Sequence, residues 1–241
     1  MNSLAEILHT ISYMALPLFL AMVLHEYAHG WVANHYGDAT ARLQGRLTLN
    51  PLVHIDPFGS IILPLICLLL PGGFFLGWAK PVPINPAQLR NPRRDMALVA
   101  AAGPGMNLLL AIASAILFSA ILSIDPTLSS YWSQQPAVTP RRDVLGMLLL
   151  PLAVMSAYSI LINLLLMLFN LIPIPPLDGG RIMTSLLPSR WAMSMARLEP
   201  YGMLIIVGLI MLDPHIHVIQ TITGTLVNVM AGAILSTVGV H

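Results

Sequence analysis

The chain has 241 residues, of which 56% are hydrophobic and only 9% are charged. A soluble domain carries about 25% charged residues, so this composition excludes a soluble globular protein and predicts an integral protein of the lipid bilayer. The formal net charge is +1 and the charges form no basic patch, which gives no indication of nucleic-acid binding.

The first predicted element is a membrane span over residues 4–34, and its C-terminal part contains the motif His-Glu-x-x-His at residues 25–29. Residues four apart share one face of an α-helix, so His25 and His29 can bind one Zn²⁺ while Glu26 faces the water that the metal activates. Imidazoles and a carboxylate at membrane depth are costly to bury and therefore indicate a functional site. The span has neither the positive charge nor the cleavage site of a signal peptide, so we expect it to be retained.

Two short elements are predicted before the next long span. Residues 42–49 mix alternation with β-forming residues, which predicts a short membrane-associated β-hairpin. Residues 60–76 are apolar but form a short stretch broken by prolines and glycines, which predicts a re-entrant segment. Lysine and arginine lie on both sides of this segment, so the positive-inside rule places both flanks, together with the zinc motif, near the cytoplasmic face.

Four further spans are predicted, which makes about five transmembrane helices and an all-α polytopic membrane protein; they cover residues 96–122, 144–171, 191–212 and 217–238. The sequence shows no internal repeat and no appended soluble domain. We therefore predict a single membrane-embedded domain over residues 1–241, with a catalytic core at about residues 4–181 and C-terminal helices at about residues 191–238.

A catalytic zinc site takes three protein ligands and keeps a fourth position for water, so the two histidines require a partner. Asp178 is the leading candidate, because it follows a segment with three prolines that cannot form a regular helix. Gly179 and Gly180 are expected to let the backbone turn sharply and bring the carboxylate towards the first span. Alternatively, Asp178 opens a turn or caps the next helix.

Three sequence blocks together resemble the site-2 protease family of intramembrane zinc metalloproteases; they are residues 25–29, 103–107 and 170–180. Three further stretches resemble its compact prokaryotic branch, which lacks PDZ and CBS domains; they are residues 45–51, 54–57 and 77–83. The resemblance implies that His25, His29 and Asp178 bind one Zn²⁺ and that Glu26 acts as general base and acid. It also implicates Asn170, eight residues before Asp178, in catalysis.

The function expected from these residues is zinc-dependent hydrolysis of peptide bonds within or near transmembrane segments of other membrane proteins. The partners are then a substrate's transmembrane segment and the lipid bilayer, and the location is a prokaryotic cell (inner) membrane with the active site near the cytoplasmic face. An unpaired strand edge at residues 42–49 would hold the unwound substrate. Two alternatives stay open: a non-hydrolytic zinc-binding scaffold, and a transporter in which Glu26 and Asp178 conduct ions or protons.

Other polar positions have two interpretations each. His54, beside Asp56, could gate the site or bind metal, or could satisfy hydrogen bonds within its loop. Gly103 and Asn107 are expected to be structural, because a small residue allows close helix packing and a buried asparagine can hydrogen-bond to a neighbouring helix.

Overall fold

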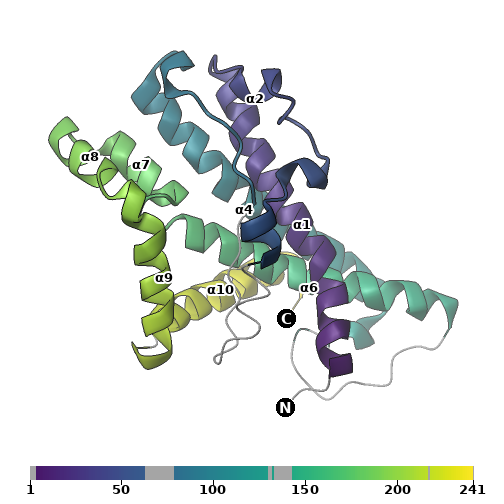
Figure 1. Cartoon of the computed structure of the whole chain (residues 1–241). Helices are drawn as coiled ribbons and strands as arrows, with labels where there is room; N and C mark the ends of the chain where they lie inside the picture. The colour runs from purple at the N-terminus through teal and green to yellow at the C-terminus, as the bar shows by residue number, and fades with distance from the viewer. Residues whose placement is uncertain (1–3, 63–78, 130–131, 133–142, 217, 241) are drawn as a thin grey trace. The chain divides into compact units, whose positions relative to one another are not determined.

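The computed structural model describes residues 4–62, 79–129, 132, 143–216 and 218–240, and helices account for most of them (Figure 1). Within these ranges, three helices are long and apolar enough to cross a membrane: α1 (Leu4–His35), α4 (Pro92–Ile124) and α6 (Val144–Asn170). They correspond to the first three predicted spans. The re-entrant segment predicted at residues 60–76 falls almost wholly outside the described residues.

The C-terminal part of the chain departs from the prediction. The span expected at residues 191–212 is wrong in its first part, because α8 (Ser189–Ala196) ends before α9 (Glu199–Ile216) begins. Pro200 explains the break, since proline fits the first turn of a helix but not its interior. The last helix, α10, covers Val218–Thr237. The apolar stretches Glu199–Leu209 and Gly224–Thr237 are shorter than those of α1, α4 and α6.

Two compact units make up the chain. The first consists of Met1–Ala21, Asn107–Leu166 and Gly224–His241, and the second of Met22–Met106 and Met167–Thr223. All five predicted site residues belong to the second unit.

Polar contacts between helices hold the first unit together. The fully buried Asn107 of α4 donates from Nδ2 to Oδ1 of Asn163 in α6 at 2.8 Å, which confirms the predicted hydrogen bond between helices. About two and three turns further along α4, Ser114 donates to Ser159 Oγ at 2.8 Å and Ser119 donates to the carbonyl of Val238 at 2.6 Å. Such bonds stabilise helix pairs where lipid supplies no hydrophobic driving force.

The β-hairpin predicted at residues 42–49 is wrong. The chain forms the short helix α2 (Thr40–Leu43), then a turn at Gly45 with a φ of +65°, then the 3₁₀ turn η1 (Pro51–His54). Asn50 accepts the N–H of Leu52 and so caps η1. A left-handed glycine and a cap followed by proline fix local turns, and these override the β propensity of the residues between them. The irregular helical turn η2 (Pro57–Ile62) follows.

An extended segment at residues 79–85 leads through η3 (Pro86–Gln88) into α4. The fully buried Asp38 ties its end to the chain after α1, accepting from the N–H of Asn85 at 2.6 Å and of Thr40 at 2.9 Å. Ala33, Leu89 and Val99 form an apolar cluster nearby. After α4 the chain forms η4 (Pro126–Ser129), and after α6 it reaches α7 (Asp178–Leu186), which packs against α8. The second unit therefore contains both chain segments that carry the predicted ligands, the C-terminal part of α1 and the start of α7.

Candidate metal centre

Two adjacent turns of α1 present His25 and His29 to one point. Their Nε2 atoms lie 3.0 Å apart, and both side chains are buried. The spacing follows from the helix, because residues four apart lie one above the other. The imidazoles therefore converge as the sequence predicted.

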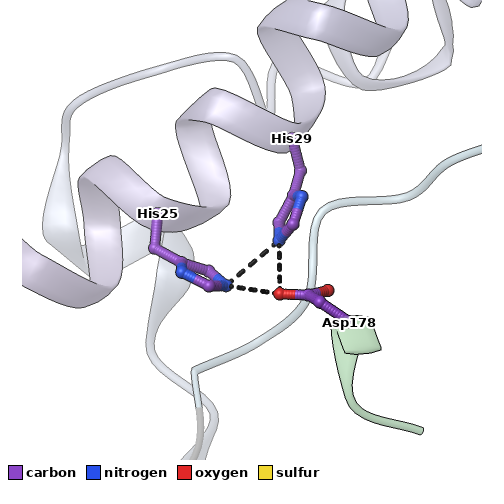
Figure 2. A group of neighbouring side chains, drawn as sticks. All are labelled: His25, His29 and Asp178. Atoms are coloured by element: carbon purple, nitrogen blue, oxygen red, sulfur yellow. Dashed lines mark hydrogen bonds and ion pairs between the residues drawn. The ribbon is translucent and has the colours of Figure 1, made fainter. Parts of the chain in front are cut away.

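Asp178, the first residue of α7, completes the group. Its Oδ2 lies 3.1 Å from Nε2 of His25 and 3.3 Å from Nε2 of His29, and Figure 2 shows both rings pointing at this oxygen. No described residue gives Oδ2 a regular hydrogen bond, although the atom is buried.

The three ligand atoms fit a zinc ion. Tetrahedral ligands at about 2.0–2.1 Å from zinc lie about 3.3–3.4 Å from one another, close to the spacings of 3.0, 3.1 and 3.3 Å found here. Two nitrogens and a carboxylate oxygen are the donor set of a catalytic zinc site with one position left for water. The buried Oδ2 without a hydrogen bond is explained if a cation is its partner.

A backbone carbonyl on α4 orients His29. Nδ1 of His29 lies 2.7 Å from the carbonyl oxygen of Val99. A carbonyl can only accept, so Nδ1 carries the proton and the lone pair of the neutral ring is at Nε2, facing Asp178. Such a second contact fixes the tautomer and the ring plane of a metal ligand.

Gly103 of α4 lies directly against the two rings. A Cβ at this position would be 2.4 Å from Nε2 of His29 and 2.6 Å from Nε2 of His25. No real side chain tolerates such distances, so only glycine allows α4 to approach this closely. The predicted close packing at Gly103 is confirmed, but its neighbours are the candidate zinc ligands and not merely a helix surface.

Close approach of backbone also explains the two glycines after Asp178. A Cβ on Gly179 would lie 2.3 Å from the carbonyl oxygen of Leu171, and one on Gly180 would lie 2.3 Å from the nitrogen of Pro175. Both glycines are helical residues of α7, so the sharp turn predicted at them is wrong. Their role is to let the loop after α6 lie on the first turn of α7, which fixes the position of Asp178.

Glu26 lies beside the metal group and is half-buried. Its Oε2 accepts the backbone N–H of Val82 at 2.8 Å, from the extended segment at residues 79–85. Sequence reasoning did not predict this partner, because a backbone amide leaves no trace in a residue pattern.

Asn170 is the last residue of α6 and is half-buried. The structure groups His25, His29 and Asp178 as possible metal ligands, and the catalytic role of Asn170 stays a prediction.

His54 is absent from that group. Its Nε2 lies 2.9 Å from the carbonyl oxygen of Thr48 and therefore donates to it, while Asp56 accepts the N–H of Gly59 at 2.7 Å. These contacts favour the interpretation in which both residues satisfy hydrogen bonds of their own loop.

Comparison with known proteins matches residues 13–212 to the family described as peptidase family M50. A Bacillus subtilis protein named "Putative zinc metalloprotease YwhC" is 37% identical over 198 residues, which are 82% of this chain and 80% of the relative. A Mycolicibacterium smegmatis protein named "Putative zinc metalloprotease Rip2" is 28% identical over 212 residues, or 86% of this chain and 71% of the relative. No solved structure matches significantly.

Proposed function

We propose that this chain, which belongs to peptidase family M50, the site-2 protease family, hydrolyses peptide bonds in or near transmembrane segments of other proteins. In this proposal Glu26 is the general base, and His25, His29 and Asp178 hold a zinc ion. The protein is a zinc metalloendopeptidase of the membrane. We propose membrane proteins as its substrates, because a site on a membrane helix is accessible to the transmembrane segments of other proteins.

One observation carries the assignment of the site. Three buried ligand atoms from α1 and α7 lie within 4.8 Å of one another, and two of the residues flank Glu26 within one motif. Burying a carboxylate with two imidazoles is costly unless a cation joins them. The cost is therefore offset by metal binding, which a purely structural cluster would not provide.

Zinc held by His25, His29 and Asp178 would lower the pKa of a water to about 7 and would polarise the scissile carbonyl. Glu26 would accept a proton from the attacking water and deliver it to the leaving amine. The side-chain amide of Asn170 donates to the carbonyl oxygen as negative charge develops there. In an alternative role, Asn170 satisfies backbone groups left free by the prolines that follow it.

An open cleft lies beside the chain segments that hold the site. Its volume is about 690 Å³, and its lining includes Val82, Pro175 and Arg181. Val82 donates to Glu26, and Pro175 lies on the loop that positions Asp178. We propose that an unwound segment binds in this cleft, beside the chain segments that hold Glu26 and Asp178, and that the cleft replaces the strand edge expected at residues 42–49.

We propose the wider arrangement from the sequence. About five transmembrane helices and a re-entrant segment at residues 60–76 form a single membrane-embedded domain. The resemblance to the compact prokaryotic branch supports a location in a prokaryotic cell membrane, and the distribution of lysine and arginine supports an active site near the cytoplasmic face.

The experiment compares peptide ends in membranes from cells that make the native chain or Glu26→Gln. Ends that map inside transmembrane segments and occur only with the native chain are expected, because loss of a general base costs at least about 100-fold in rate. Equal expression and equal bound zinc are the controls. Identical peptide ends would contradict the proposal; they would favour the scaffold, or the transporter if Glu26→Gln also abolished ion flux.

A further inference from the structure

The backbone amide of Val82 binds the carboxylate of Glu26. Its N–H lies 2.8 Å from Oε2, and it is the only N–H between residues 81 and 83, because Pro81 and Pro83 have none. A charged acceptor makes this hydrogen bond about twice as strong as a neutral one. One oxygen of Glu26 is thus held by the chain, and the carboxylate is restrained about its last torsion.

Buried groups hold the donor in place. Nη2 of Arg46 donates to the carbonyls of Lys80 at 2.8 Å and Pro81 at 3.2 Å, and the N–H of Lys80 donates to the carbonyl of His54 at 2.8 Å. Arg46 and His54 are both more than nine-tenths buried. Burying a guanidinium is costly, and its hydrogen bonds to two backbone carbonyls offset that cost only if the carbonyls stay in place. These bonds therefore fix the path of the segment before Val82.

The Val82 side chain fixes the same amide from the side of α1. Val82 is buried, and a Cβ on Gly30 would lie 3.0 Å from its Cγ1. Gly30 is four residues after Glu26 and therefore on the same face of α1. The absence of a side chain at Gly30 lets the segment lie close enough to the helix for its amide to reach the carboxylate.

We propose that the Val82 amide is the positioning group of the catalytic base: it fixes Oε2 of Glu26 and so leaves Oε1 to exchange the proton, and Arg46 acts through it. The inference rests on the proposed function of Glu26. An unrestrained glutamate populates several rotamers, and reacting groups displaced by about 1 Å lose about 100-fold in rate. Arg46 and Val82 are therefore expected to determine turnover and not zinc binding.

Val82→Pro removes the amide hydrogen from a segment that already contains prolines on both sides, and Val82→Ala keeps it. The probe is a lipid-reconstituted synthetic peptide of a segment identified through the Glu26→Gln comparison. We expect kcat of Val82→Pro to fall at least 10-fold below that of Val82→Ala, with KM and bound zinc within twofold. Equal kcat values at equal zinc content would overturn the proposal.

Arg46→Gln gives a second route should Val82→Pro fail to retain zinc. The matched control is Arg42→Gln, which changes an exposed arginine four residues earlier. A lower kcat in Arg46→Gln alone, with zinc retained, is expected. A native kcat, or loss of zinc from both Val82→Pro and Arg46→Gln, would overturn the proposal, because the segment would then be dispensable or would support the metal site itself.

A spectroscopic measurement needs no substrate. The chain has three glutamates, Glu6, Glu26 and Glu199, so ¹³C labelling of glutamate carboxylates gives few infrared bands, and Glu26→Gln identifies the one from Glu26. That band should shift in Val82→Pro and not in Val82→Ala. An unshifted band contradicts the hydrogen bond, whereas cleavage that survives Glu26→Gln contradicts the proposed function instead.

Discussion

His29 donates its Nδ1 proton to the carbonyl oxygen of Val99 across 2.7 Å, so a residue of α4 decides which nitrogen of an α1 ligand faces Asp178. The same stretch of α4 carries Gly103, whose missing side chain leaves room for both rings. One helix therefore sets both the tautomer and the space of the metal centre.

Gly103→Ala should lose zinc. Its Cβ would lie 2.4 Å from Nε2 of His29, so at least one ring must move; contacts of this kind influence metal affinity about 10- to 100-fold. The measurement is zinc per chain after dialysis against a graded chelator. Gly105→Ala is the control, since a Cβ there meets nothing within 4 Å; equal zinc retention in the two variants would disprove the steric argument.

Gly179→Ala should separate α7 from the loop before it. The added Cβ would be 2.3 Å from the carbonyl oxygen of Leu171, and moving α7 moves Asp178 away from the histidines. We expect weaker zinc binding and a lower rate of peptide cleavage. Gly208→Ala provides the comparison, because the space around Gly208 is open. Native zinc affinity in Gly179→Ala would show that Gly179 is not needed to position Asp178.

Asp178→Asn should weaken zinc binding more than the same replacement at any aspartate outside the centre. The amide keeps the shape of the side chain but removes the negative charge opposite the cation. Isothermal titration of the zinc-free protein with zinc measures the difference. The exposed Asp143, which accepts the N–H of Gly146 at 2.9 Å, gives the control Asp143→Asn, and equal affinities would remove Asp178 from the ligand set.

Asn107→Ala should destabilise the first unit without affecting zinc. Asn163 would keep a buried amide that has lost its Asn107 partner, a loss of about 1–3 kcal/mol in general and of about 0.6 kcal/mol on average between membrane helices. The check is a double-mutant cycle with Asn163→Ala, in which unfolding in mixed micelles gives the free energy of each variant. A coupling energy near zero would show that the pair contributes shape and not hydrogen bonding.

Ala196→Trp should obstruct the cleft. Ala196 lies on its wall, away from the metal ligands, so a larger side chain should raise KM several-fold while kcat and bound zinc stay native. Steady-state cleavage of a reconstituted peptide separates the two parameters. Ala233→Trp, at an exposed position of α10, is the control for the bulk of the new residue; an unchanged KM would exclude the cleft as the substrate route.

The sequence by itself determined the converging histidine pair and the main helices. His25 and His29 had to converge because a helix repeats every 3.6 residues, and the spans of α1, α4 and α6 followed from apolar length. The same local rules failed at residues 42–49, where a left-handed glycine and an asparagine cap override β propensity. They failed again at Pro200, which separates α8 from α9.

Only the tertiary structure decided how the pair becomes a site. Asp178 reaches the histidines because Gly179 and Gly180 let a loop lie on α7, His29 takes its tautomer from Val99, and Glu26 is held by Val82. These partners are backbone groups or missing side chains, and they come from segments far away along the chain. A pattern of residue types records neither a carbonyl nor an empty space, so the packing of the chain alone could reveal them.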